Sequence, residues 1–306
     1  AAKSKPTPDS AAAIQTAAET IRLDGVRILL AEDNVVNRFV ASELLMNNGC
    51  ICAMAVNGRE ALEMALSETH DVILMDCQMP ELDGFEATRA IREAEKKAGD
   101  GKHRPIIALT ANAIKGDREL CLAAGMDDYV TKPIDPRELF SAIHKQLPAD
   151  RQTVLATVIE APVKAPIVNV PANTEPAVLP IDVNTLQRRC MGSRKLASKA
   201  LKMFAASLVK DVGSLLESVS KGDARAAAAS AHKIKGAAAN VSAEPVRSLA
   251  AKLEALAKQD ALAQASDALE QLDCEIRRFQ EYLSTAMGDL MPPEPSPSPT
   301  TAKEPT

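Results

Sequence analysis

Five short apolar runs, each followed by a stretch with helical spacing of apolar residues, fill the first half of this 306-residue chain. The apolar runs are 26–31, 51–56, 72–75, 105–109 and 129–131, and the helical stretches are 36–48, 58–67, 85–96, 115–124 and 136–146. Such alternation is typical of a parallel sheet whose two faces are both covered by helices. We therefore predict an α/β doubly wound domain with a five-stranded parallel sheet over residues 23–147.

The second half has a different pattern, with no strand signal over residues 181–290. Apolar residues recur there at intervals of three and four, as in Leu201, Phe204 and Leu208. Breaks at 222–223, 242–245 and 259–260 divide this block into four long helices. The pattern predicts an all-α antiparallel four-helix bundle.

Proline-rich segments separate and flank the two blocks. We expect residues 1–22 to be a linker, residues 148–180 a flexible tether, and residues 291–306 a disordered tail. The chain begins with Ala rather than Met and shows no signal peptide or apolar run of ~20 residues. We expect it to be a piece of a longer or processed protein.

Composition excludes several function classes. The net charge is −5, and the chain has no Trp and only two Tyr, which argues against a nucleic-acid-binding surface. The six Cys residues show no Cys-x-x-Cys spacing, so zinc sites and a disulfide scaffold are not expected. A reducing cytoplasm fits this cysteine usage best.

Polar residues gather where the predicted strands end. Glu32 and Asp33 follow the first strand, Asp76 the third, Thr110 the fourth and Lys132 the fifth. Ligands of parallel α/β sheets bind beyond the carboxyl ends of the strands. Three crowded carboxylates would raise one another's pKa unless a cation joined them, and Mg²⁺ favours such oxygen ligands. The set predicts phosphoryl transfer to a carboxylate, assisted by Mg²⁺, Thr110 and Lys132.

The first block resembles a response-regulator receiver domain, which has a flavodoxin-like fold. The matching motifs are Ala31-Glu32-Asp33-Asn34, Leu74-Met75-Asp76-Cys77-Gln78-Met79-Pro80 with Gly84, Ala108-Leu109-Thr110-Ala111, and Lys132-Pro133. Glu32 stands where Asp is commoner in the family, a departure that we expect to be tolerated. The resemblance covers almost all of residues 26–147.

The resemblance assigns a role to each matching residue. Asp76 corresponds to the phospho-accepting aspartate, and Thr110 and Lys132 to the pair that binds the phosphoryl group. The implied Mg²⁺ ligands are Asp33 directly, Glu32 mainly through water, the Asp76 carboxylate, and the backbone carbonyl of Gln78. It further implies a small neighbour at Ala111, a rotamer-switching aromatic at Tyr129, and a cis peptide at Lys132-Pro133.

His232 stands in an alanine-rich helical stretch of the second block. Lys235 lies one turn further on the same face, where its ammonium could meet a phosphoryl oxygen. Gly236 costs about 1 kcal/mol of helix stability, which close approach of a docking partner would explain. A neutral imidazole is a competent nucleophile at neutral pH. The string His232-Lys233-Ile234-Lys235-Gly236-Ala237 resembles the signature of histidine phosphotransfer (Hpt) domains, and the resemblance extends over 185–287.

A receiver and an Hpt domain in one chain imply a phosphorelay, in the order found in the carboxyl-terminal part of hybrid sensor histidine kinases. Asp76 would accept a phosphoryl group from an upstream histidine kinase and exchange it with His232, which would pass it to a downstream response regulator. Kinase activity would reside upstream of this chain, where a kinase region could also dimerise. This part would be cytoplasmic, without nucleic-acid or membrane contact, although the longer protein could be anchored in the inner membrane.

Two other functions stay open at this point. The receiver and bundle could act as a docking and regulatory module with little phosphotransfer. A haloacid-dehalogenase-like phosphatase is disfavoured, because that chemistry needs an Asp where Gln78 stands. The sequence also allows transfer from Asp76 to His232 either within one chain or between chains, since the tether can span roughly 30 Å.

Overall fold

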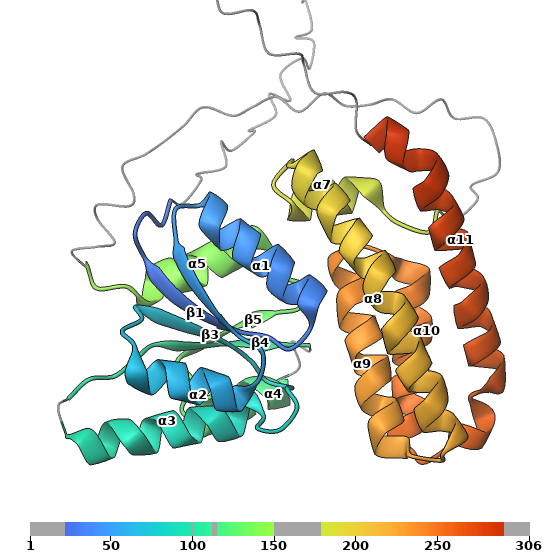
Figure 1. The fold of residues 1–306 in the computed structure, drawn as a ribbon. Helices are drawn as coiled ribbons and strands as arrows, with labels where there is room; N and C mark the ends of the chain where they lie inside the picture. Colours follow the sequence, from blue (N-terminus) through green and yellow to red (C-terminus); the bar gives the residue numbers. More distant parts are fainter. Residues whose placement is uncertain (1–21, 100, 112–114, 150–178, 291–306) are drawn as a thin grey trace, which may run out of the picture.

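The computed structural model describes residues 22–99, 101–111, 115–149 and 179–290, and within these it forms two units (Figure 1). The predicted tail at 291–306 lies outside the described residues, as do nearly all residues of the predicted linkers at 1–22 and 148–180. No helix in the described part of the chain combines the length and the apolar character needed to cross a membrane.

The first unit is built on a fully parallel sheet with strand order β2-β1-β3-β4-β5. The strands are β1 (Arg27–Ala31), β2 (Ile51–Ala55), β3 (Val72–Asp76), β4 (Ile106–Thr110) and β5 (Asp128–Thr131). The helices are α1 (Val35–Asn47), α2 (Gly58–Ser67), α3 (Gly84–Ala98), α4 (Lys115–Ala124) and α5 (Pro136–Gln146). The predicted five-stranded doubly wound fold is confirmed, and no element end differs from its predicted position by more than two residues.

Alternation along the strands divides the apolar residues between two cores. In β1, Ile28 and Leu30 pack on the side of α1 and α5, whereas Leu29 and Ala31 pack on the side of α2, α3 and α4. All four side chains are completely buried. Burial on both faces explains why these strands are continuous apolar runs in the sequence.

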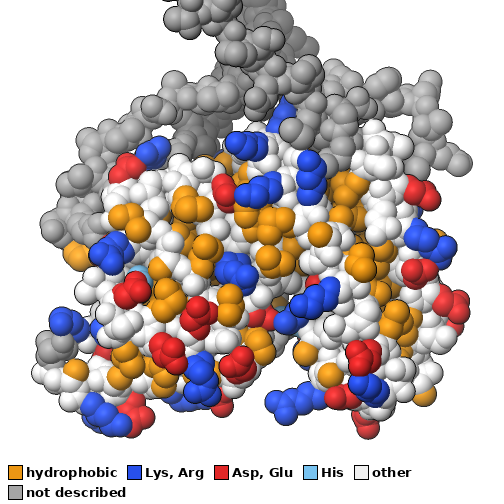
Figure 2. All heavy atoms as spheres, in the orientation of Figure 1, with side chains coloured by type: hydrophobic (Ala, Val, Ile, Leu, Met, Phe, Trp, Pro, Cys, Tyr) orange, Lys and Arg blue, Asp and Glu red, His pale blue; other side chains and the backbone are white. Residues whose placement is uncertain are grey.

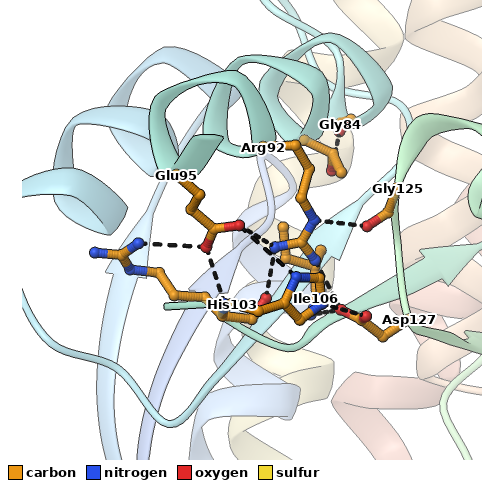
Figure 3. A network of polar contacts seen from close by, with 9 residues as sticks. Gly84, Arg92, Glu95, His103, Ile106, Gly125 and Asp127 are labelled. Atoms are coloured by element: carbon orange, nitrogen blue, oxygen red, sulfur yellow. Dashed lines mark hydrogen bonds and ion pairs between the residues drawn. The ribbon is translucent and has the colours of Figure 1, made fainter. Parts of the chain in front are cut away.

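An ionic network fixes the edge of the sheet that lies opposite the predicted site (Figure 3). Arg92 of α3 contacts the buried carboxylate of Glu95 at 2.8 Å and that of Asp127 at 2.7 Å. Asp127 also accepts from the N–H of Ile106, the first residue of β4, at 2.7 Å, and contacts His103 at 2.6 Å. These contacts connect α3 to the amino-terminal ends of β4 and β5. The predicted site residues lie at the opposite, carboxyl-terminal ends of the strands.

The second unit is helical. Its helices are α7 (Val183–Arg189), α8 (Arg194–Ser220), α9 (Ala224–Asn240), α10 (Glu244–Lys258) and α11 (Ser266–Leu290), with a 3₁₀ turn at Leu262–Gln264. The four long helices α8 to α11 confirm the predicted bundle. Pro245 was assigned to a break, but it lies in the first turn of α10, where its missing N–H costs nothing. Phe204 and Phe279 join α8 to α11 edge to face, with ring centroids 5.2 Å apart.

The two units contact one another through α1, which packs against α8 and α9 (Figure 1). One cluster of buried apolar side chains continues from the α1 and α5 face of the sheet into the bundle. In the space-filling view the two units meet through the middle of the molecule and separate toward its lower edge (Figure 2). The contact brings α9, which carries His232, to the carboxyl ends of the strands.

Candidate functional site

Three carboxylates meet at the carboxyl ends of β1 and β3. Glu32 and Asp33 directly follow β1, and Asp76 is the last residue of the neighbouring strand β3. One oxygen from each side chain lies within 4.8 Å of the others, although Glu32 and Asp76 are only 1% and 4% exposed. The predicted convergence of Glu32, Asp33 and Asp76 is therefore present in the structure.

Lys132 follows β5 and reaches across this cluster. Its Nζ atom lies 2.6 Å from Oε2 of Glu32 and 2.7 Å from Oδ2 of Asp76. The N–H of Lys132 donates to the carbonyl of Thr110, the buried last residue of β4, at 2.7 Å. The Lys132-Pro133 peptide is cis, as the resemblance implied. One ammonium thus joins two buried carboxylates from two different strands.

Burial and charge determine the ionisation of Asp76. Burial raises the pKa of its carboxyl above the ordinary value, the negative charge of Glu32 raises it further, and Lys132 acts in the opposite direction. Within the receiver unit, Lys132 is the ammonium that contacts this cluster, and one positive charge does not balance three crowded carboxylates. A hard divalent cation with oxygen ligands fits this donor set.

Gln78 lies beside the cluster. The N–H of Gln78 donates to Oδ1 of Asp76 at 3.2 Å, and the Gln78 side chain is exposed. This bond fixes the loop after β3 against the aspartate. Tyr129 is partly buried on β5, and in the parallel register it pairs with Ala108 of the neighbouring strand β4.

His232 projects from α9 and is held by a carboxylate that the sequence analysis did not identify. Its Nδ1 atom lies 3.0 Å from Oε1 of Glu254 on α10, a residue that is 4% exposed. A carboxylate can only accept, so Nδ1 carries the hydrogen, and in the neutral imidazole the lone pair is then on Nε2. The sequence does contain a signal for Glu254, because it is a charged residue on the buried and otherwise apolar face of α10. The other residues of that face are Val246, Ala250, Leu253 and Ala257.

Glu254 also binds two lysines. Nζ of Lys235 lies 2.5 Å from its Oε2 atom and Nζ of Lys258 lies 2.6 Å from its Oε1 atom. Burial raises the pKa of Glu254, but the hydrogen bonds from His232, Lys235 and Lys258 outweigh burial and hold that pKa well below its usual range. The sequence predicts that Lys235 meets a phosphoryl oxygen. In the structure its ammonium is paired with Glu254, and the residue lines the cavity between the two units.

One cavity joins the two units. Its lining comes from the strand ends, α1, α9 and α10: Glu32, Asp33, Asn34, Asn37, Asp76, Ala111, Lys132, Pro133, His232, Lys233, Lys235, Gly236, Ala239 and Arg247. Of the residues predicted from sequence, Asp76, Lys132, Glu32, Asp33, His232 and Lys235 are thus brought together. Thr110 and Gln78 adjoin Lys132 and Asp76 without lining the cavity.

Polar contacts between α1 and α9 hold this junction. Nδ2 of Asn240 donates to Oδ1 of Asn37 at 2.7 Å, and both side chains are buried. Nδ2 of Asn34 donates to the carbonyl of Lys233 at 3.1 Å. A Cβ atom on Gly236 would lie 3.3 Å from Nδ2 of Asn37, which confirms that this glycine serves a close approach. No local signal identified the two asparagines, because they become partners only when the units pack.

Comparison with known proteins finds one family match in each of the two units. Residues 28–144 match the model of the response regulator receiver domain, and residues 199–282 match the model of the Hpt domain. The chain therefore consists of a response regulator receiver domain followed by an Hpt domain, the two module types of a two-component phosphorelay.

Relatives of this chain include sensor histidine kinases and hybrid signal transduction histidine kinases. Sensor histidine kinase GacS of Pseudomonas protegens is 32% identical over 266 residues, which cover 85% of this chain and 27% of the relative. Hybrid signal transduction histidine kinase I of Dictyostelium discoideum is 48% identical over 126 residues, or 40% of this chain and 7% of the relative. The chain thus spans a minor part of the length of the curated relatives that it matches.

A solved structure matches the receiver alone. It is the receiver domain of sensor histidine kinase PA1611 from Pseudomonas aeruginosa, with a magnesium ion coordinated in its active site cleft. The two are 46% identical, the match covers 40% of this chain and 97% of that domain, and the TM-score is 0.37.

Proposed function

We propose that this chain relays a phosphoryl group between Asp76 of its receiver domain and His232 of its Hpt domain. The observation that carries the proposal is the shared cavity, which is lined by both side chains. An upstream histidine kinase would supply the group to Asp76, and a separate response regulator would receive it from His232. Kinase activity would belong to a part of the longer protein outside this chain, and this part would work in the cytoplasm.

In the first step, a carboxylate oxygen of Asp76 attacks the phosphorus of the donor. An O–P bond forms, the bond from phosphorus to the donor breaks, and the donor leaves with that electron pair. Lys132 is placed to neutralise charge that develops on the phosphoryl oxygens, since its Nζ atom lies 2.7 Å from Asp76. Thr110, at the end of the adjacent strand, is proposed as the hydroxyl donor to the same oxygens.

In the second step, Nε2 of His232 attacks the phosphorus of the aspartyl phosphate. An N–P bond forms and the O–P bond to Asp76 breaks, which returns Asp76 to a carboxylate. Glu254 holds the reactive tautomer by accepting from Nδ1, and its negative charge stabilises the positive charge that the phosphorylated ring acquires. The reverse sequence of bonds returns the group to Asp76.

A Mg²⁺ site belongs to this proposal. Glu32, Asp33 and Asp76 would hold the ion with the backbone carbonyl of Gln78, and the crowding of three carboxylates around the one ammonium that the receiver itself supplies, Lys132, supports it. When bound, such an ion offsets negative charge on the carboxylates and on the phosphoryl oxygens.

The test is to map the label after treatment with a small-molecule phosphodonor and Mg²⁺. Wild type is compared with Asp76→Ala, His232→Ala and the control His144→Gln, whose histidine lies outside the cavity lining. Acid-labile, base-stable label identifies phosphohistidine, and base-labile label identifies the aspartyl phosphate. We expect base-stable label in wild type and the control alone, and base-labile label in His232→Ala. Label that never leaves Asp76 would favour a docking and regulatory module instead.

The shared cavity supports transfer within one chain. A mixture of Asp76→Ala and His232→Ala chains tests this, because only transfer between chains can then produce phosphohistidine. We expect far less base-stable label in the dilute mixture than in wild type. Equal label in both would show that transfer between chains is as effective.

A further inference from the structure

Lys233 joins the Hpt domain to an acid of the receiver site. Its Nζ atom lies 2.8 Å from Oδ2 of Asp33, whose side chain is only 8% exposed. Lys233 directly follows His232 on α9, and its backbone carbonyl accepts from Asn34. The ammonium of one domain is therefore paired with a proposed cation ligand of the other.

A second path connects the same site to the Hpt domain. Oε1 of Glu32 accepts from Nδ2 of Asn37 at 2.9 Å, and Oδ1 of Asn37 accepts from Asn240 of α9 at 2.7 Å. Both acids that accompany Asp76 are thus linked to α9, Asp33 directly and Glu32 through one amide.

Charge across the junction depends on Lys233. Burial raises the pKa of Asp211 on α8, Lys233 and Lys210 lower it, and the negative charge of Asp33 raises it. Asp33 and Asp211 therefore repel one another from opposite domains, and Lys233 interacts favourably with both. Without this ammonium the contact would place two carboxylates in mutual repulsion.

We propose that Lys233 couples Hpt docking to the cation content of the receiver site. In the docked chain the Lys233 ammonium neutralises the Asp33 carboxylate, which a bound divalent cation would otherwise neutralise. Docking and divalent-cation binding therefore oppose one another while Asp76 is unphosphorylated. This inference rests on the proposed function, because the cation site is part of it. Linkage requires the opposition to be reciprocal: docking weakens cation binding by the same factor by which the cation weakens docking.

The coupling makes docking depend on whether Asp76 is phosphorylated. With a divalent cation and Lys132 present, the charges of three carboxylates are already balanced, so a further ammonium is attracted much less. A phosphoryl group on Asp76 adds negative charge and makes Lys233 favourable again. The Hpt domain is therefore drawn in before transfer, and it is released once the group has moved to His232.

The test measures Mg²⁺ binding to the whole unphosphorylated chain by isothermal titration calorimetry at low ionic strength. Lys233→Ala is compared with wild type, with Lys233→Arg, which keeps the charge, and with Lys252→Ala, which removes an exposed lysine outside the cavity lining. We expect Lys233→Ala to lower the Mg²⁺ Kd about three- to tenfold, as loss of one nearby charge predicts. Lys233→Arg and Lys252→Ala should stay within about twofold of wild type.

Each outcome is decisive. An unchanged Kd in Lys233→Ala, or an equal gain in Lys252→Ala, overturns the proposal while leaving the cation site intact. Absence of Mg²⁺ binding in every variant refutes the cation site itself, and the coupling with it. Small-angle X-ray scattering supplies the reciprocal measurement: Mg²⁺ should increase the radius of gyration of wild type, and an unchanged radius would contradict the release of the Hpt domain.

Discussion

Nδ1 of His232 lies 3.0 Å from Oε1 of Glu254, a carboxylate that also binds Lys235 and Lys258. This contact fixes which ring nitrogen is free to receive a phosphoryl group. It also places a buried negative charge behind the imidazole, on the side away from the incoming group.

We expect Glu254→Gln to slow phosphohistidine formation by roughly 10- to 100-fold, because a neutral amide holds the tautomer less firmly and stabilises the charged ring less. The rate is measured as transfer of label from phosphorylated Asp76 to His232 in a single turnover. Glu270→Gln, at an exposed position of α11, is the matched control and should leave the rate unchanged. A wild-type rate in Glu254→Gln would remove the carboxylate from the mechanism.

The same carboxylate makes stability depend on pH. The pKa of Glu254 is lower in the folded protein than its ordinary value near 4.5, so its ion pairs stabilise the fold above that value. We expect Glu254→Gln to lower the free energy of unfolding by about 1–3 kcal/mol at pH 7. The difference from wild type should shrink as the pH falls below about 4.5, where the unfolded state begins to take up the proton. Urea unfolding followed by circular dichroism at several pH values measures it, and a difference that grows in acid would contradict this account.

Mg²⁺ should stabilise the receiver domain. At a concentration ten times its Kd, the ion adds about 1.4 kcal/mol to the free energy of unfolding, because it binds the folded carboxylate cluster and not the unfolded chain. Asp33→Asn should abolish most of this gain, whereas Asp83→Asn, at the cap of α3, should keep it. Thermal unfolding with and without a chelator is the measurement. An equal Mg²⁺ effect in Asp33→Asn would place the ion elsewhere.

The buried amide pair between the domains should control docking. Asn240→Ala leaves Oδ1 of Asn37 without its 2.7 Å partner, and an unsatisfied buried acceptor costs about 1–3 kcal/mol. We expect slower transfer from Asp76 to His232, while phosphorylation of Asp76 by a small donor is unchanged. Asn184→Ala, at an exposed position of α7, is the control. If Asn240→Ala transfers normally, the pair is not needed for the productive contact.

Two helical glycines separate helix stability from docking. Gly213 of α8 has nothing within 4 Å of an added Cβ atom, so Gly213→Ala should stabilise the bundle by roughly 0.5–1 kcal/mol without affecting transfer. At Gly236 the added Cβ atom would press on Asn37 at 3.3 Å, so Gly236→Ala should slow transfer although it favours the helix. Comparison of unfolding curves with single-turnover rates tests this, and equal rates in both variants would refute a docking role for Gly236.

Much of the site followed from the sequence because topology is decided locally. Apolar runs that alternate with amphipathic helices permit little except a parallel sheet, and a parallel sheet gathers its strand ends at one edge. Glu32, Asp33, Asp76, Thr110 and Lys132 therefore had to converge. His232 was identifiable because its motif lies within one helix, where i and i+3 neighbours share a face.

The remaining contacts were decided by tertiary packing. Glu254 reaches His232 only because α10 lies beside α9, and no spacing within one helix relates these two residues. Asn37 and Asn240 are 203 residues apart, and Lys233 finds Asp33 only where α9 meets α1. Sequence periodicity tells which face of a helix is buried, but the partner across that face depends on how whole elements fit together. The chain thus determined its two folds and most of its reactive groups, while the packing of α1 against the bundle decided how those groups face one another.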